Sequence, residues 1–282
     1  MKKITLILSL LLVSLMCHTQ IKVDLRGIEL PRDVDLLDTL DYTILRCEYT
    51  QWIVQDTLRP TRGLKDRMLL QIGNKVSKFF NYSQFINDSI VRGQIMDGLS
   101  LQEILNLATG RKIGKITYEF FRGYPEKKST YIGDITIDYF SYEEEVDVPE
   151  WKLLPDTMTV LGYLCKKATC TFHCRDYIAW YTPEVAVSEG PWKLTGLPGL
   201  VLKSYDEKRQ ILFNAVAIEK VEWKDPITYT LRRRLQQTTK SKFQRIYTDY
   251  MKNPGVIDQQ YVTSDTPVRS KSKPYNPIEL CE

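Results

Sequence analysis

Short runs rich in β-branched and aromatic residues dominate this chain of 282 residues, and they constrain its fold more than any other feature. Turn-forming residues such as Gly, Asn, Asp and Pro separate the runs, as in chains built mostly of strands. Tyrosine, which favours strands, is abundant, with 17 residues. We therefore expect a mainly β protein whose strands fall within 43–55, 68–72, 76–82, 113–121, 134–142, 159–171, 177–182, 200–205 and 211–223.

The middle of the chain gives the clearest hairpin. Residues 159–171 lead into the tip His173-Cys174-Arg175-Asp176, and residues 177–182 return. The pair Gly73-Asn74 predicts a second hairpin turn, and residues 123–128 predict a polar turn. The strict alternation of residues 134–142 predicts one strand. That strand would carry Ile135, Ile137 and Tyr139 on one face and Thr136, Asp138 and Phe140 on the other.

Two helices are expected among the strands. Ser100 and Glu103 form a capping-box pattern before an apolar turn, and Gly110 can end that short helix. A longer helix would start at Asp225-Pro226, end at Asn253-Pro254-Gly255, and keep its many cations in water. The predicted fold is a curved antiparallel sheet or a sandwich, with the long C-terminal helix and the short helix packed on it.

The N-terminus resembles a secretory signal peptide. Lys2 and Lys3 precede a mostly apolar stretch, residues 4–16, and polar residues follow. We expect residues 1–20 to form the signal peptide and residues 21–282 a single β-rich domain with a polar tail over 267–274. An uncleaved anchor helix and lipidation at Cys17 are the alternatives; Met16 argues against lipidation, because a lipobox has a small residue there.

Charge and hydropathy exclude some partners. The chain has 39 Lys and Arg against 35 Asp and Glu, and removal of Lys2 and Lys3 leaves 37 against 35. A surface so nearly balanced does not predict nucleic acid as the main partner. No stretch after the signal approaches the ~20 apolar residues of a membrane-spanning helix.

Cysteine usage fits an oxidising compartment. Five cysteines remain after the signal, so at least one thiol is left unpaired among themselves. The spacing leaves the connectivity open, and the pairs considered are Cys170 with Cys174 and Cys47 with Cys165.

One cluster at the hairpin tip carries potential chemistry. Cys170, His173 and Cys174 bring thiol and imidazole groups within five residues, a combination that suits copper or zinc. A disulfide at a hairpin tip beside an exposed histidine is the interpretation we prefer. A hydrolase-like enzyme using His173, Cys174 and Arg175 is the other alternative. No cofactor motif is found, and no cofactor is expected.

The segment 190–200, GPWKLTGLPGL, is the most unusual stretch. Pro198 and Gly199 occupy the two central positions of a predicted type II turn, since Pro fixes φ near −65° and Gly allows positive φ. A strand follows rather than a helix, so the stretch is interpreted as a tight turn that needs no ligand. Its structural residues are Gly190, Pro191, Trp192, Gly196, Leu197, Pro198, Gly199 and Leu200.

These residues also carry a family resemblance. The sequence GLPGLVL, residues 196–202, resembles the motif of the GLPGLI family, and the resemblance extends to GPWKLTG, RDYIAWYTPEVAVSEG, LGYLCKKATCTF, MLLQIGNKVSKFF and YNPIEL. Cys174 departs from the small residue expected there, and Cys170 also looks particular to this chain. The resemblance implies an exported bacterial protein of unknown biochemical role, often associated with TonB-dependent outer-membrane receptors.

We therefore expect a non-enzymatic protein of the periplasm or outer membrane that binds a ligand or an envelope partner. An outer-membrane receptor is the partner that the resemblance implies. A concave, apolar-lined face of the sheet would favour ligand binding, whereas a fully packed sandwich would favour a protein partner.

Overall fold

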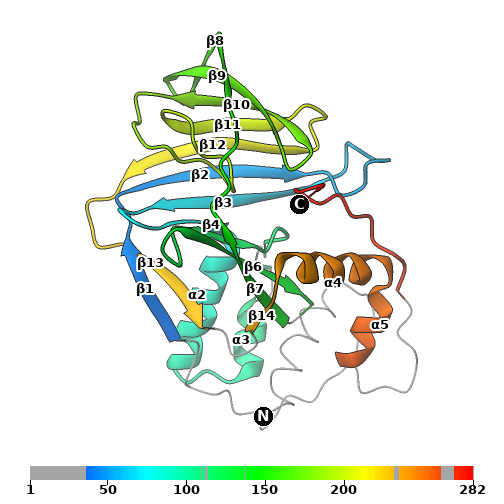
Figure 1. The fold of residues 1–282 in the computed structure, drawn as a ribbon. Helices are drawn as coiled ribbons and strands as arrows, with labels where there is room; N and C mark the ends of the chain where they lie inside the picture. Colours follow the sequence, from blue (N-terminus) through cyan, green and yellow to red (C-terminus); the bar gives the residue numbers. More distant parts are fainter. Residues whose placement is uncertain are drawn as a thin grey trace.

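The computed structural model describes residues 36–108, 110–111, 114–136, 138–231, 235–261 and 270–281, so the expected signal peptide lies outside the described residues. Within them, 12 strands form one sheet in the order β14-β7-β6-β5-β4-β3-β2-β12-β11-β10-β9-β8 (Figure 1). Their bounds are β2 Leu45–Ile53, β3 Leu64–Ile72, β4 Ser77–Asn81, β5 Glu119–Arg122, β6 Lys128–Ile135, β7 Asp138–Glu145, β8 Lys152–Val160, β9 Tyr163–Phe172, β10 Arg175–Thr182, β11 Leu200–Asp206, β12 Ile211–Lys220 and β14 Leu235–Gln237.

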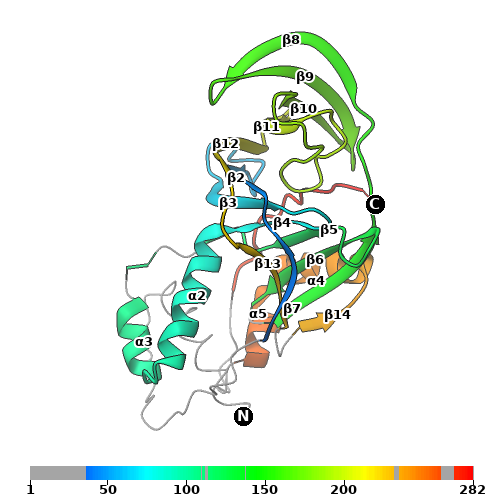
Figure 2. The same ribbon diagram turned by 90° about the vertical axis from the view of Figure 1, so that its left-hand side faces the viewer.

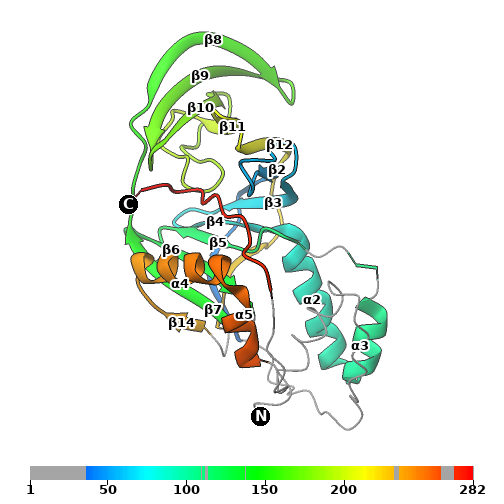
Figure 3. The same cartoon turned by 90° about the vertical axis from the view of Figure 1, so that its right-hand side faces the viewer.

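The strands that dominate the described residues confirm the mainly β prediction, and the large sheet is strongly curved. Figures 2 and 3 show β8 to β12 arching over the rest of the sheet, with the β10–β11 loop and the C-terminal segment on the concave side. Neighbouring strands are antiparallel except β14, which runs parallel to β7, so the sheet is mixed.

The main core lies on the concave face. Along β2 every second residue is buried, as the two-residue period of a strand requires. Tyr49, Phe79, Tyr177 and Phe213 belong to one cluster, together with Trp192 from the β10–β11 loop. The inward positions of strands far apart in sequence therefore meet around that loop.

Two further layers cover β4 to β7. The ribbon of β1 (Leu36–Tyr42) and β13 (Pro226–Leu231) places Ile227 and Tyr229 against Val76, Phe121 and Ile132. Helix α4 (Lys240–Lys252) places Phe243 against Ile135, Phe140 and Tyr142. The remaining helices are α2 (Tyr82–Met96), α3 (Leu101–Ala108), α5 (Pro254–Asp258) and the 3₁₀ helix η1 (Gln259–Tyr261), and no helix in the described residues is long and apolar enough to cross a membrane.

The prediction of a single strand over residues 134–142 is wrong, because the chain turns within this range. β6 ends at Ile135 and β7 begins at Asp138, and the two residues face each other across a hairpin. Thr136 lies in the turn with a φ of 60°. The turn places Ile135, Phe140 and Tyr142 together under α4 and puts Tyr139 on the opposite side with Ile132.

The prediction of one long C-terminal helix from Asp225 to Asn253 is also wrong, because a strand occupies its first part. Residues 226–231 form β13, because Ile227 and Tyr229 alternate with threonines and bury against the sheet. The helix starts only at Lys240, after Thr239, whose hydroxyl accepts the N–H of Lys242.

Several local predictions are confirmed. β9 and β10 pair antiparallel, and the positive φ of His173 (47°) and Cys174 (59°) forms the expected tip. In α3 the Ser100 N–H and hydroxyl both donate to Glu103, as a capping box predicts. Helix α2 was not predicted; its N-cap is Asn81, whose side-chain oxygen accepts the N–H of Gln84.

Candidate functional site

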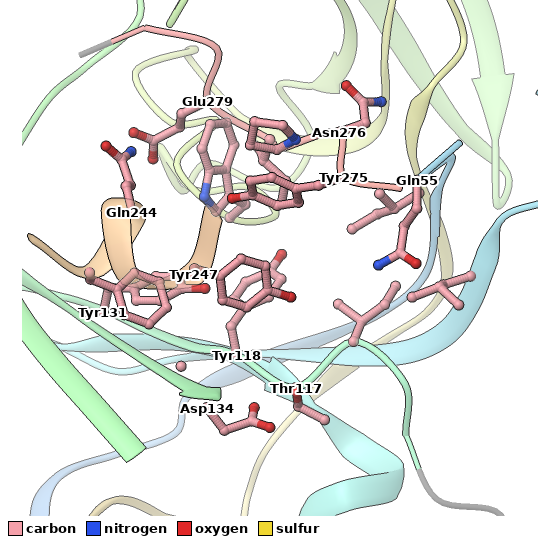
Figure 4. A pocket seen from close by; sticks show the side chains of 18 of the residues that line it. Gln55, Thr117, Tyr118, Tyr131, Asp134, Gln244, Tyr247, Tyr275, Asn276 and Glu279 are labelled. Carbon is pink, nitrogen blue, oxygen red and sulfur yellow. The ribbon is translucent and has the colours of Figure 1, made fainter. Parts of the chain in front are cut away.

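A cavity of about 150 Å³, partly open to solvent, lies between strands β6 and β7, helix α4 and the C-terminal segment (Figure 4). We call residues 275–281 the C-terminal strap, because this segment crosses the concave side of the sheet (Figure 3). Tyr275 to Glu279 of the strap line the cavity, and Trp192 closes it from the β10–β11 loop.

Three tyrosines form the wall on the sheet side. The ring of Tyr131 stacks on Tyr118, with centroids 5.8 Å apart, and on Tyr142, with centroids 5.0 Å apart. Tyr131 in β6 and Tyr142 in β7 face each other in the strand register. Strand pairing sets the spacing of the Tyr131 and Tyr142 rings, and Tyr118, which directly precedes β5, extends the row of nearly parallel rings.

The opposite wall comes from α4 and the strap. Tyr247 packs against Tyr275 at 5.0 Å, and Phe243 contacts both Tyr247 and Tyr131. Phe243 and Tyr247 are four residues apart, so one face of α4 presents both rings. Helix, sheet and strap are thus joined by continuous aromatic contacts around the cavity.

The tyrosines remain protonated at neutral pH. Burial raises the pKa of Tyr131, and the neighbouring Tyr247 and Tyr118 raise it further. Burial likewise raises the pKa of Tyr275 to about 12. The Tyr118 hydroxyl donates to Gln51 Oε1 at 3.1 Å, whereas those of Tyr131, Tyr247 and Tyr275 have no hydrogen-bond partner in the described part of the chain.

Polar groups interrupt the aromatic lining. Gln55, Gln244 and Asn276 supply amides, and Asp134 and Glu279 supply carboxylates (Figure 4). The lining thus combines flat apolar faces with donors and acceptors. This combination suits a small organic ligand more than a metal ion.

Charged residues form a network beside the cavity. Lys193 Nζ contacts Glu144, and it lies 2.6 Å from Glu279 Oε1. Lys240 Nζ lies 2.5 Å from Glu279 and 3.4 Å from Glu144. Burial raises the pKa of Glu279, but the two lysines outweigh burial and hold that pKa below its usual value.

His173 lies at the edge of this network, not in solvent. Its side chain is only 7% exposed, and its Nδ1 is 3.8 Å from Glu279 Oε2. Burial lowers the pKa of His173, and Lys193 and Lys240 act in the same direction. The exposed histidine expected at the hairpin tip is therefore wrong.

The segment 190–200 contributes to the cavity through Trp192. Trp192 is 2% exposed and has a backbone φ of 54°. Its side chain lines the cavity, so the segment is more than a turn. The type II turn is not formed. The Gly199 N–H donates to Leu197 O, and the Leu200 N–H donates to Val185 O instead of closing the four-residue turn.

The cysteine pairings differ from those considered. Cys174 is bonded to Cys281 in the strap, and Cys47, Cys165 and Cys170 are buried free thiols. Cys47 and Cys165 lie on strands four positions apart in the sheet, beyond the reach of a disulfide. Cys170 points into the core, away from Cys174 in the turn.

The hairpin tip does not assemble the proposed catalytic or metal groups. Cys174 is oxidised, so it supplies no thiolate to a set with Cys170 and His173. Arg175 is buried, and it donates to Asp206, Asn276 and the carbonyls of Pro277 and Ile278. These residues fasten the strap to the sheet, and no metal-binding group of three or more His, Cys, Asp or Glu occurs in the described residues.

Most cavity residues were not among the sequence candidates. The tyrosines on strands and on α4 follow the periodicity of core residues, so their pattern does not mark a cavity. The strap could be suspected only from the apolar and aromatic residues that follow the polar tail. Its place on the sheet depends on contacts with residues far away in the sequence.

Part of the chain matches a described family. The model of the PNGase F-II N-terminal family, described as N-glycanase peptide, N-terminal domain, matches residues 136–244, which include Tyr142, Trp192 and Phe243 of the cavity. No curated protein matches the sequence.

Solved structures titled "Structure of PNGF-II in P21 space group" and "Structure of PNGF-II in C2 space group" each match with a TM-score of 0.46 and 14% identity. The matches cover 72% of this chain, and 33% and 32% of those chains. The chain thus spans about a third of the length of these structures.

Proposed function

We propose that this chain is an exported, non-enzymatic binding protein whose cavity holds one ring of a saccharide. The observation that carries the proposal is the cavity itself, with its facing tyrosine walls and polar side chains. A cavity of about 150 Å³ holds roughly one six-membered ring.

The chemistry of the lining favours a polyhydroxylated ring. The C–H faces of a sugar ring pack on aromatic rings, while its hydroxyls both donate and accept hydrogen bonds. The hydroxyls of Tyr131, Tyr247 and Tyr275 serve either role, and Gln55 and Gln244 add amide groups. A purely apolar ligand would leave these groups without partners, which costs binding free energy.

The family similarity supports the same ligand class. The description of the matched family names an N-glycanase, and the matched residues 136–244 supply part of the cavity wall. That name belongs to the family; for this chain, a saccharide ligand is our proposal.

The ion network favours binding over hydrolysis. A carboxyl group that acts as a general acid near neutral pH needs a raised pKa. Glu279 is paired with Lys193 and Lys240, and its pKa is lowered. Glu279 is therefore ionised and paired with two ammonium groups near neutral pH, so it is not poised to supply a proton.

Export and envelope partners are part of the proposal. The leader-like residues 1–20 and the resemblance of residues 196–202 to the GLPGLI motif support a periplasmic or outer-membrane location, with an envelope receptor as partner. Cell fractionation and mass determination of the mature N-terminus test this part; full-length protein confined to the cytoplasm would contradict export.

Saturation-transfer NMR with free hexoses and N-acetylhexosamines tests the cavity. At least one sugar should receive magnetisation, and Tyr247→Phe should weaken its binding about 2- to 10-fold, the usual effect of one hydrogen bond. Tyr250→Phe is the matched control, because it removes a hydroxyl from the same helix at a residue that bonds Lys273 and does not line the cavity. Absence of binding by every sugar, or equal effects of both variants, would contradict the proposal.

A further inference from the structure

The strap wall is fixed to the sheet at both ends. The Asn276 side chain donates to Val54 O at 2.7 Å, and Arg175 Nε donates to Ile278 O at 2.9 Å. Cys281 is bonded to Cys174. These contacts hold the backbone of the strap, but none of them orients the side chain of Glu279.

Lys193 reaches Glu279 from the β10–β11 loop. Its side chain is 3% exposed, and its Nζ lies 5.6 Å from the Phe120 ring and 5.7 Å from the Trp192 ring. From this position it contacts Glu144 of β7 and lies 2.6 Å from Glu279 of the strap. One ammonium group thus connects a loop, the sheet and the strap, next to a residue that lines the cavity.

We propose that Lys193 is a positioning residue of this site: its ammonium holds the strap through Glu279 and sets the orientation of the carboxylate that faces the cavity. That this orientation matters for a ligand rests on the proposed saccharide site. The holding of the strap by Lys193 is independent of any ligand.

The surrounding charges determine what the loss of Lys193 does. Without its ammonium, the carboxylates of Glu144 and Glu279 remain close together in a buried place, with only Lys240 between them. Like charges with little access to water repel each other and take up protons more readily. Charged and titratable groups from five elements face Glu279: Lys193 from the loop, Lys240 from α4, Glu144 and Tyr142 from β7, His173 from the hairpin tip and Tyr275 from the strap. Asp147 in turn faces His173.

Hydrogen exchange on the full chain measures the hold on the strap. Lys193→Met keeps an unbranched, apolar side chain in the same place but removes the charge. We expect the amides of residues 276 and 278–280 to exchange at least 10-fold faster, while those of β2 and β3 keep their rates. Lys208→Met is the matched control, because Lys208 is exposed in a turn away from the network.

Titration of the Glu279 carboxyl carbon, assigned with Glu279→Gln, separates positioning from general destabilisation. In Lys193→Met the pKa of Glu279 should rise above that in the unmodified protein. If glucose or N-acetylglucosamine binds, its affinity should then fall on acidification in this variant, while the unmodified protein keeps its affinity over the same pH range. Failure of both sugars to bind would overturn only the proposed function, since exchange and titration need no ligand.

If Lys193→Met does not fold, Lys193→Met with Glu144→Gln keeps one lysine and one carboxylate and allows the same measurements. Faster exchange confined to the strap, with a raised Glu279 pKa, supports the positioning role. Unchanged strap exchange or an unchanged Glu279 titration overturns it, as does an equal change of exchange throughout the sheet.

Discussion

At the scale of single residues, the close approach of two backbone segments explains the glycine at position 199, just before β11. A Cβ on Gly199 would lie 2.1 Å from Thr182 O and 2.9 Å from Pro183 N, and both atoms belong to the backbone. The φ of Gly199 is 148°, which other residues rarely adopt. Gly199 thus lets the start of β11 lie directly beside the end of β10, where Leu200 pairs with Thr182.

Gly199→Ala should destabilise the protein by about 3 kcal/mol or more, because strain and an overlap that the backbone cannot relieve add together. Urea denaturation measures this loss. Gly98→Ala is the matched control, since Gly98 has a φ of 81° but open space around its Cβ position. The control should lose only about 1–2 kcal/mol, the cost of the left-handed conformation. Equal losses in the two variants would show that the overlap is relieved.

At the scale of elements, local pattern predicted the strands but not always where the chain turns. The alternation of residues 134–142 contains no Gly or Pro that would mark the turn at Thr136. For residues 226–231, Asp225-Pro226 resembles a helix start, yet the buried Ile227 and Tyr229 gain more by packing on Phe121 and its neighbours. Burial against residues distant in the sequence determined both the turn at Thr136 and the strand at 226–231, and a short local sequence pattern does not contain that information.

One covalent bond also fastens the strap to the β9–β10 hairpin. The Cys174–Cys281 disulfide joins residues 107 positions apart. In the chain-entropy account, closing a loop of this length stabilises the folded state by about 4–5 kcal/mol. The double variant Cys174→Ser with Cys281→Ser should therefore unfold at lower urea concentration. Reductant should destabilise the unmodified protein similarly and leave the variant unchanged; insensitivity of both would contradict a stabilising role.

At the scale of the whole molecule, the cavity combines segments that are distant in sequence. Tyr118, Trp192, Tyr247 and Tyr275 line one space because the sheet bends and the strap returns across it. The sequence predicted a β protein with a concave sheet as one outcome. It could not place the strap, because Arg175, Lys193 and Lys240 reach it from three separate elements.

Chemical labelling of the three buried free thiols measures how often the sheet unfolds. Burial raises the pKa of Cys47 to about 12, that of Cys165 to about 11 and that of Cys170 to about 12. Their thiolates are therefore scarce and inaccessible at pH 8. Iodoacetamide labelling followed by peptide mapping should modify them at least about a thousand-fold more slowly in buffer than in urea. Fast labelling of Cys170 in buffer would show that the hairpin opens separately from the core.

The charge network beside the strap predicts how stability depends on pH. Burial lowers the pKa of His173 below its usual 6.5, so the unfolded chain takes up this proton first as the pH falls. The free energy of unfolding should therefore decrease from about pH 7 downward, by at most about 1.4 kcal/mol per pH unit for one proton. Glu279 adds a second pH range in which stability changes. Burial raises its pKa, but Lys193 and Lys240 outweigh burial and hold the pKa below 4.5. The stability that ionised Glu279 contributes is therefore lost as the pH falls below that value.

Urea denaturation between pH 8 and pH 4 separates the two groups. His173→Asn removes the titration while suiting the positive φ of the turn, so the decrease that begins near pH 7 should vanish. Glu279→Gln should keep that decrease and remove part of the loss near pH 4.5. A decrease near pH 7 that persists in His173→Asn would mean that another group titrates there, because His173 could then not be its source.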